Sequence, residues 1–245
     1  MGSVQLESAA ARLRAAFEKL GIWPAQAAAQ RALTDSMLRY VALLAKWNRT
    51  YNLTAVRDAE QMLAQHVFDC AAVAIPLKRL VEQRCADRPP DSGRPRVIDV
   101  GSGAGLPGVV LALLWPEADF VLVEPVGKKA AFLQQVKTEL SLANVEIARC
   151  RIEDLAFIGP PPDAIVCRAF ASLADYAVAV EALAAPHTVV AAMKARPDEQ
   201  EKRALTPGWR VVDEIALQVP ELDARRSLIV LERASSVNQE QEPRE

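Results

Sequence analysis

Residues 97–114 read "VIDVGSGAGLPGVVLALL", in which a short apolar run leads into four glycines within eight residues. A second apolar run, with helical spacing, follows the last glycine. The pattern is typical of a buried strand that turns through a glycine-rich loop into a helix, because glycine adopts positive φ angles and lets the backbone approach a ligand. It predicts a ligand-binding loop at the carboxyl end of a strand in an α/β fold.

The sequence after this loop alternates between short apolar runs and stretches with helical spacing. The candidate strands that follow the first cover 119–124, 145–150, 163–168 and 187–194. This alternation predicts parallel strands joined by crossover helices. The last two candidate strands, 209–219 and 226–233, are separated by only six residues. Since that gap is too short for a crossover, these two strands are expected to form an antiparallel hairpin.

Residues 1–81 show helical spacing without a strand pattern and are expected to form a helical extension that packs on the core. Helices are expected over 5–20, about 25–47 and 58–75, with an Asn- and Thr-rich loop over 48–58. The other expected segments are a Pro-rich linker over 82–96, a core domain over 97–233 and a disordered tail over 234–245.

The composition excludes several classes of protein. Of the 245 residues, 51% are hydrophobic, yet no apolar stretch reaches the roughly 18 residues of a membrane span. The N-terminus lacks the pattern of a secretion signal, which favours a cytoplasmic protein without a membrane partner. Four cysteines without a CxxC pair and only two histidines favour reduced thiols and argue against a metal site or a histidine triad. A net charge of −2 argues against RNA binding by total charge alone and leaves a local basic patch open.

The glycine spacing alone leaves the ligand ambiguous. Gly103, Gly105 and Gly108 fit a GxGxxG pattern, and Glu124 follows Gly103 by 21 residues, as in a dinucleotide-binding fingerprint. A nicotinamide-dependent oxidoreductase, a ribosome-binding module that uses the fold only as a scaffold, and a turn without a ligand are therefore all alternatives.

Acidic residues at the ends of the first three strands favour a different ligand. They are Asp99, Glu124 and Glu153. Carboxylates repel a pyrophosphate, but they suit the hydroxyls, the amine and the cationic end of S-adenosylmethionine. With the terminal hairpin, the expected fold resembles the mostly parallel, Rossmann-like sheet of class I S-adenosylmethionine-dependent methyltransferases.

Several longer stretches resemble one family, the bacterial small-subunit ribosomal RNA methyltransferase G, also called glucose-inhibited division protein B. The stretches that carry the resemblance are "KWNRTYNLTAVRD" (46–58), "QHVFDC" (65–70), "GSGAGLPG" (101–108), "CRAFASL" (167–173) and "LQVPELDARRSLIVLER" (217–233). The resemblance implies an enzyme that methylates N7 of one guanine in 16S ribosomal RNA of the small subunit. It also implies S-adenosylmethionine as cofactor and a cytoplasmic, mostly monomeric protein.

Cofactor contacts are expected along the carboxyl end of the sheet. By resemblance, they fall on Gly101, Leu106, Ile152, Glu153 and Arg168. The residue pattern adds the strand-end carboxylates and the remaining loop glycines, namely Asp99, Glu124, Gly103 and Gly105. Glu124 is expected to accept from the ribose hydroxyls.

Arg168 is also the candidate for positioning the target, since a guanidinium can hold a guanine O6 or a phosphate. The alternative is a structural ion pair with a nearby carboxylate such as Asp99. N7 of guanine carries a free lone pair, so the reaction needs no general base.

The expected RNA-binding residues are Lys46, Arg49 and Arg57, which flank aromatic and amide side chains. The alternative for the rings of Trp47 and Tyr51 is a place in the helical core. Arg225 and Arg226, beside the last strand, are a second candidate surface. His66 and Asp69 lie close together in the sequence, and a structural role is expected for the histidine.

Overall fold

The computed structural model describes residues 3–87, 89, 93–155, 159–195 and 199–234. The helical elements are α1 (Ser3–Lys19), α2 (Ala27–Tyr51), α3 (Ala59–Met62), the π-helix η1 (Leu63–Phe68), α4 (Asp69–Ala71), α5 (Ala74–Arg84), α6 (Gly108–Leu114), α7 (Gly127–Glu139), the 3₁₀-helix η2 (Ile152–Asp154), α8 (Leu173–Val180) and α9 (Glu199–Arg203). The strands are β1 (Arg96–Val100), β2 (Asp119–Val123), β3 (Val145–Ala148), β4 (Ala164–Arg168), β5 (Val189–Lys194), β6 (Trp209–Leu217) and β7 (Arg226–Arg233).

The strands form one seven-stranded sheet in the order β3-β2-β1-β4-β5-β7-β6. The first five strands are parallel, and β7 runs antiparallel to both β5 and β6. The predicted mostly parallel sheet with a terminal antiparallel hairpin is confirmed. The loops after β1 to β4 therefore open at one edge, called the carboxyl edge below. Since β7 runs in the opposite direction, it begins at this same edge.

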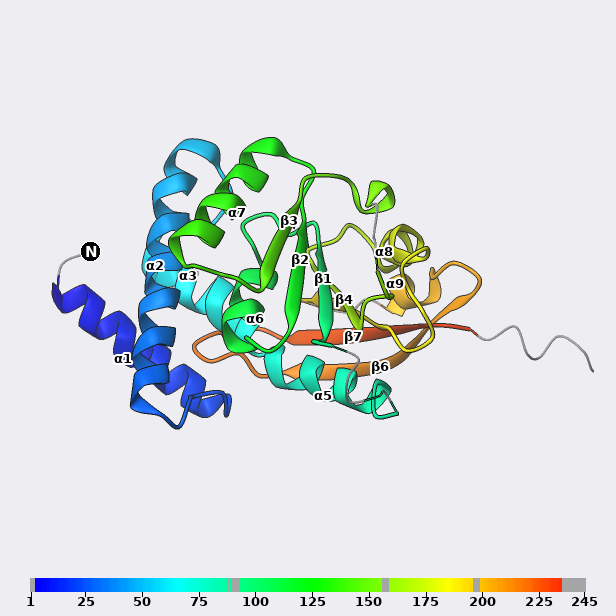
Figure 1. The fold of residues 1–245 in the computed structure, drawn as a ribbon, viewed down its shortest axis with the longest axis horizontal. Helices are drawn as coiled ribbons and strands as arrows, with labels where there is room; N and C mark the ends of the chain where they lie inside the picture. Colours follow the sequence, from blue (N-terminus) through cyan, green and yellow to red (C-terminus); the bar gives the residue numbers. More distant parts are fainter. Residues whose placement is uncertain (1–2, 88, 90–92, 156–158, 196–198, 235–245) are drawn as a thin grey trace, which may run out of the picture.

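Two hydrophobic cores lie on the two faces of the sheet, beneath the helices that Figure 1 shows. One core joins the helices of residues 3–84 to α6, α7 and one sheet face, and α8 covers the other face. Alternation along β1 explains the arrangement: Val97 belongs to the first core, whereas Ile98 and Val100 belong to the second. None of the described helices is both long and apolar enough to cross a membrane.

Helix α2 ends at Tyr51, four residues inside the stretch predicted as a loop. Asn52, with φ of 50°, ends the helix in the left-handed conformation, and its N–H donates to the carbonyl of Asn48. The Asn48 side chain then fixes the loop, because it donates to Val56 O and accepts from Thr54 N. The predicted loop therefore begins after a turn of helix that these two asparagines stabilise.

The single helix predicted over 58–75 is replaced by α3, η1 and α4, and α5 begins at Ala74. The first three elements are continuous, with a π-helical segment in which the N–H of Asp69 donates to Ala64 O, five residues back, and a turn at residues 72–73 separates them from α5. Helix α5 ends at Arg84 and so extends three residues into the predicted 82–96 linker. Except for Ala234, the predicted disordered tail lies outside the described residues.

A hydrogen bond from Tyr40 ties the N-terminal helices to the glycine-rich loop. Tyr40 is fully buried in α2, and its hydroxyl donates to the carbonyl of Ala104 over 2.7 Å. The helices therefore support the loop directly as well as covering the sheet.

Replacing Tyr40 by Phe should lower the free energy of unfolding by about 1 kcal/mol, because the buried Ala104 carbonyl loses its donor. Urea unfolding measures the difference. The control is Tyr51→Phe, whose hydroxyl has no hydrogen bond to a described residue and whose side chain is exposed. Equal midpoints for Tyr40→Phe and the wild type would show that the bond adds no stability.

Candidate functional site

The glycine-rich loop is fastened to the end of β2. Gly101 N and Ser102 N both donate to Val123 O, at 2.9 and 3.1 Å. Gly103 N donates to Oε2 of Glu124 over 2.8 Å, and the other carboxylate oxygen accepts from Val126 N over 2.8 Å. Glu124, only 3% exposed, therefore fixes the loop in addition to its predicted role toward a ribose. Each oxygen keeps a further lone pair for a ligand hydroxyl.

The loop glycines serve two different purposes. Gly101 has φ of 68°, and a Cβ built on it would meet nothing within 4 Å. A Cβ on Gly105 would lie 2.5 Å from Cγ2 of Val109, and one on Gly108 would overlap Leu122 and Asp99. Gly105 and Gly108 are thus needed for packing of α6, whereas open space faces Gly101, as a bound ligand requires.

Asp99 is fully buried between β1 and α6. Its Oδ2 accepts from Gly108 N over 2.9 Å, while Oδ1 has no hydrogen-bond partner among the described residues. Burial raises the pKa of this carboxyl to about 7. Asp99 therefore holds the start of α6 against the strand, and its predicted contact with the cofactor stays a prediction.

Arg168, at the end of β4, is held by a carboxylate, but the partner is Asp69 rather than Asp99. Nη1 of Arg168 lies 3.2 Å from Oδ2 of Asp69 and donates to Gln65 O over 3.1 Å. Arg226, from β7, reaches the other Asp69 oxygen with its Nε, over 2.8 Å. The structural ion pair that was the alternative for Arg168 thus exists, and it brings together three elements at the carboxyl edge.

His66 lies beside this cluster and is neutral at physiological pH. Burial, and then the positive charge of Arg168, lowers the pKa of His66 to about 4. In the tautomer that satisfies both contacts, Nδ1–H donates to Gln65 O and Nε2 accepts from the hydroxyl of Thr54, each over 2.8 Å. With both ring nitrogens engaged, His66 has the structural role expected for it.

The residues after β3 also lie at the carboxyl edge. Ile152, the first residue of η2, is buried in the second core, and the neighbouring Glu153 is exposed. Leu106, in the glycine-rich loop, is 3% exposed. The structure therefore gathers the predicted cofactor residues of β1, β2, β3 and β4 at one edge of the sheet.

The three predicted RNA-binding cations are exposed, and none forms an ion pair with a described residue. Lys46 and Arg49 lie in the last two turns of α2, and Arg57 lies in the loop that follows. Trp47 packs against Phe132 of α7 and against Tyr51, with ring centroids 5.6 and 5.2 Å apart. The core alternative therefore holds for Trp47, whereas Tyr51 is 40% exposed.

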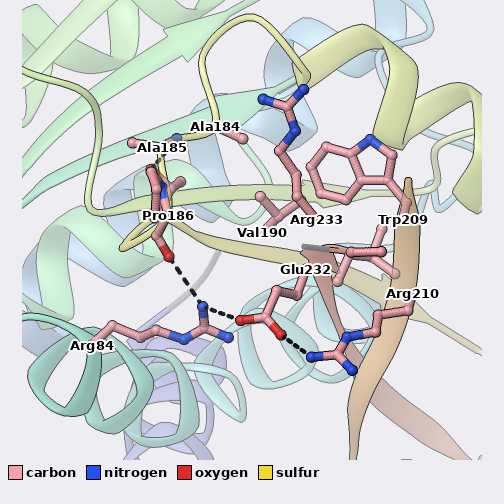
Figure 2. A pocket seen from close by; sticks show the side chains of 12 residues that line it. Arg84, Ala184, Ala185, Pro186, Val190, Trp209, Arg210, Glu232 and Arg233 are labelled. Carbon is pink, nitrogen blue, oxygen red and sulfur yellow. Dashed lines mark hydrogen bonds and ion pairs between the residues drawn. The ribbon is translucent and has the colours of Figure 1, made fainter. Parts of the chain in front are cut away.

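A cavity of about 420 Å³ lies at the opposite edge of the sheet, where β5 begins and β7 ends. Figure 2 shows its charged lining, in which the carboxylate of Glu232 lies between the guanidinium groups of Arg84 and Arg210. Arg233 pairs with Glu181. None of the predicted site residues lines this cavity, so it is not the candidate active site.

The described residues hold no cluster of three or more His, Cys, Asp or Glu side chains that could bind a metal ion. All four cysteines are free thiols.

Comparison with known proteins identifies the family of this chain. A family model described as "GidB: rRNA small subunit methyltransferase G" matches residues 33–230. Two curated relatives are named "Ribosomal RNA small subunit methyltransferase G". The one from Bordetella avium (strain 197N) is 44% identical over 228 residues, which cover 93% of this chain and 95% of the relative. The one from Acidovorax sp. (strain JS42) is 45% identical over 200 residues, covering 82% and 87%.

Among solved structures, a SAM-dependent methyltransferase from Leishmania major gives a TM-score of 0.49 at 18% identity, covering 79% of this chain and 83% of that one. The family match spans the glycine-rich loop, the Asp69 cluster and most of β7. Together with the two relatives it shows that this chain belongs to the rRNA small subunit methyltransferase G family.

Proposed function

We propose that this chain transfers a methyl group from S-adenosylmethionine to N7 of a guanine in 16S ribosomal RNA of the small ribosomal subunit. The observation that carries the proposal is the glycine-rich loop, fixed by Glu124 and open at Gly101, in a chain of this family. The proposal includes a cytoplasmic location, where ribosomal subunits are found in bacteria, and action as a monomer.

The residues at the carboxyl edge fit this cofactor. Gly101, Gly103, Gly105 and Leu106 form the loop that would pass beneath it, and Glu124 has free lone pairs for the two ribose hydroxyls. Ile152 and Glu153 would hold the adenine through a backbone N–H and a carboxylate. Asp99 would act from behind the loop, through its hydrogen bond to Gly108.

The proposed chemistry needs orientation rather than a base. When bound, the cofactor supplies the electrophilic methyl group, and N7 of guanine has a lone pair that needs no deprotonation. Arg168 would orient the guanine or its phosphate from the end of β4, since its guanidinium offers several donors in a fixed plane. His66 is neutral and fully engaged in hydrogen bonds, which agrees with a reaction without a histidine base.

The proposal is tested by incubating the purified protein with small subunits from cells that lack it, together with labelled S-adenosylmethionine. Chemical cleavage at N7-methylguanine then maps the label in the RNA. The expected result is one labelled guanine in 16S RNA. Label on another atom, or none in subunits and naked RNA alike, would contradict the proposed reaction.

Replacing Glu124 by Ala should weaken cofactor binding by about 1–3 kcal/mol, the scale of a lost charged hydrogen bond. S-adenosylmethionine and S-adenosylhomocysteine should be affected equally, since they share the ribose. Calorimetry measures both, and Glu146→Ala, an exposed carboxylate on β3, is the control. A loss confined to S-adenosylmethionine would mean that Glu124 interacts with the sulfonium charge instead of the ribose.

Replacing both Arg49 and Arg57 by Glu should weaken binding to the small subunit and leave cofactor affinity unchanged, because these cations would contact RNA phosphates. The dependence of log K on log salt should become shallower by about 1.4 for two lost single-stranded contacts. The matched control replaces Lys19 and Arg31 by Glu, an identical charge change near the opposite end of α2. If both double variants bind subunits equally well, this surface does not contact RNA.

A further inference from the structure

We propose that Asp69 is a positioning residue that holds the guanidinium groups of Arg168 and Arg226 together as a paired site for acceptor oxygens of the RNA. The inference rests on the proposed function, and it adds Asp69 and Arg226 to the residues that present the target guanine. It follows from the geometry of the three side chains, the π-helix that precedes Asp69, and the donors that the arginines leave free.

The carboxylate of Asp69 divides its two oxygens between the two arginines. Oδ2 lies 3.2 Å from Nη1 of Arg168, and Oδ1 lies 2.8 Å from Nε of Arg226. The side chain of Asp69 is 5% exposed, and each arginine is 22% exposed. Strands β4 and β7 are separated by β5, so their backbones are about 10 Å apart. Without the carboxylate, two like charges in this partly buried place would repel each other.

The π-helix η1 supplies a second acceptor for Arg168. In an α-helix, the N–H of Asp69 would bond to the carbonyl of Gln65, four residues back. Here it donates to Ala64 O and His66 O, and the Gln65 carbonyl accepts from Nη1 of Arg168 over 3.1 Å as well as from Nδ1–H of His66. A single guanidinium nitrogen is thus held by a backbone carbonyl of η1 and by the side chain of Asp69, the first residue of α4. Such bulges are common at functional sites.

Both arginines keep donors for a ligand. Nε of Arg168 and Nη2 of Arg226 have no hydrogen-bond partner among the described residues. Two guanidinium groups and one carboxylate, beside a neutral His66, leave a net charge of +1. Arg226 also lines a cavity of about 1150 Å³ at this edge, whose described lining holds four cations and four carboxylates. The cluster therefore presents positive charge and oriented N–H groups beside the proposed methyl-transfer site, which suits RNA oxygens.

A second carboxylate between two arginines provides an internal comparison. Glu232 lies 3.0 Å from Arg84 and 2.9 Å from Arg210, at the opposite edge of the sheet (Figure 2). It joins the end of α5 to the terminal hairpin, far from the glycine-rich loop. Both clusters place one carboxylate between two arginines, but only the Asp69 cluster lies beside the proposed site. A substitution at Glu232 therefore shows the effect of losing such a bridge where it can have only a structural role.

The test uses Asp69→Asn in the full chain, with small subunits as substrate. The amide keeps the size of the side chain, but its NH₂ group faces one of the two arginines. We expect kcat to fall about 10- to 100-fold because the guanidinium groups are displaced. The KM for subunits should not rise, since the variant is one charge more positive, and the calorimetric affinity for S-adenosylmethionine should not change. If Asp69 had a purely structural role, the substitution would lower the affinity for subunits or for S-adenosylmethionine together with kcat.

The control Glu232→Gln should keep the wild-type kcat and KM, whatever its thermal stability. Arg226→Lys keeps the charge but lacks the forked donors, and its kcat should fall in the same way. This second variant keeps the inference testable if Asp69→Asn does not fold. The inference is overturned if folded Asp69→Asn and Arg226→Lys both turn over like the wild type, or if Asp69→Asn loses cofactor affinity together with kcat. If the wild type methylates no 16S RNA, the proposed function fails and the inference falls with it.

Discussion

The hydrogen bond from the N–H of Gly103 to the carboxylate of Glu124 fixes the arrangement of the whole site. A loop with three glycines at positive φ has many conformations in isolation, and it needs external contacts to adopt one of them. Glu124 supplies that contact from β2, Asp99 supplies another at the start of α6, and Tyr40 adds a third from α2. The loop is therefore shaped before a ligand arrives, which lowers the entropic cost of binding.

Sheet topology then determines which side chains can meet the ligand. The parallel strands β1 to β4 end at the carboxyl edge, and the reversed direction of β7 brings its first residue, Arg226, to the same edge. The N-terminal helices contribute Asp69 from α4 and exposed cations from the end of α2. Because these helices share one hydrophobic core with α6 and α7, they form part of the site rather than a separate cover.

The buried carboxyl groups at the carboxyl edge have two different roles. Glu124 and Asp99 accept from backbone N–H groups and shape the loop, whereas Asp69 accepts from side chains and shapes a pair of cations. A sequence with net charge −2 can in this way present local positive charge beside a cofactor loop bordered by carboxylates. In the proposed reaction, the first group would serve the cofactor and the second the RNA.

Local patterns predicted much of this structure. The glycine spacing, the alternation of strands and helices and the six-residue gap before the last strand can each be recognised within a short stretch of sequence. Partnerships between distant residues were not predictable in this way. The alternative for Arg168 was an ion pair with a nearby carboxylate such as Asp99, and its partner is Asp69, which lies 99 positions away and meets it only in the folded chain. The π-helix was not predictable for the same reason, since its Gln65 carbonyl accepts from Arg168 of β4, 103 positions away.

The end of α2 also differs from the prediction, because side-chain hydrogen bonds across the following loop stabilise it. Asn48 is typical of the start of a loop, since asparagine favours turns, but its side chain bonds to Val56 and Thr54 and allows the helix to continue to Tyr51.

The most direct test of the proposed cofactor site is a crystal structure of the chain with S-adenosylhomocysteine. We predict the ligand over Gly101, with the Gly103–Glu124 hydrogen bond intact, the ribose at Glu124 and the sulfur facing Arg168. A ligand in the cavity at Arg84 and Glu232, or a Glu124 side chain released from the loop, would contradict this prediction.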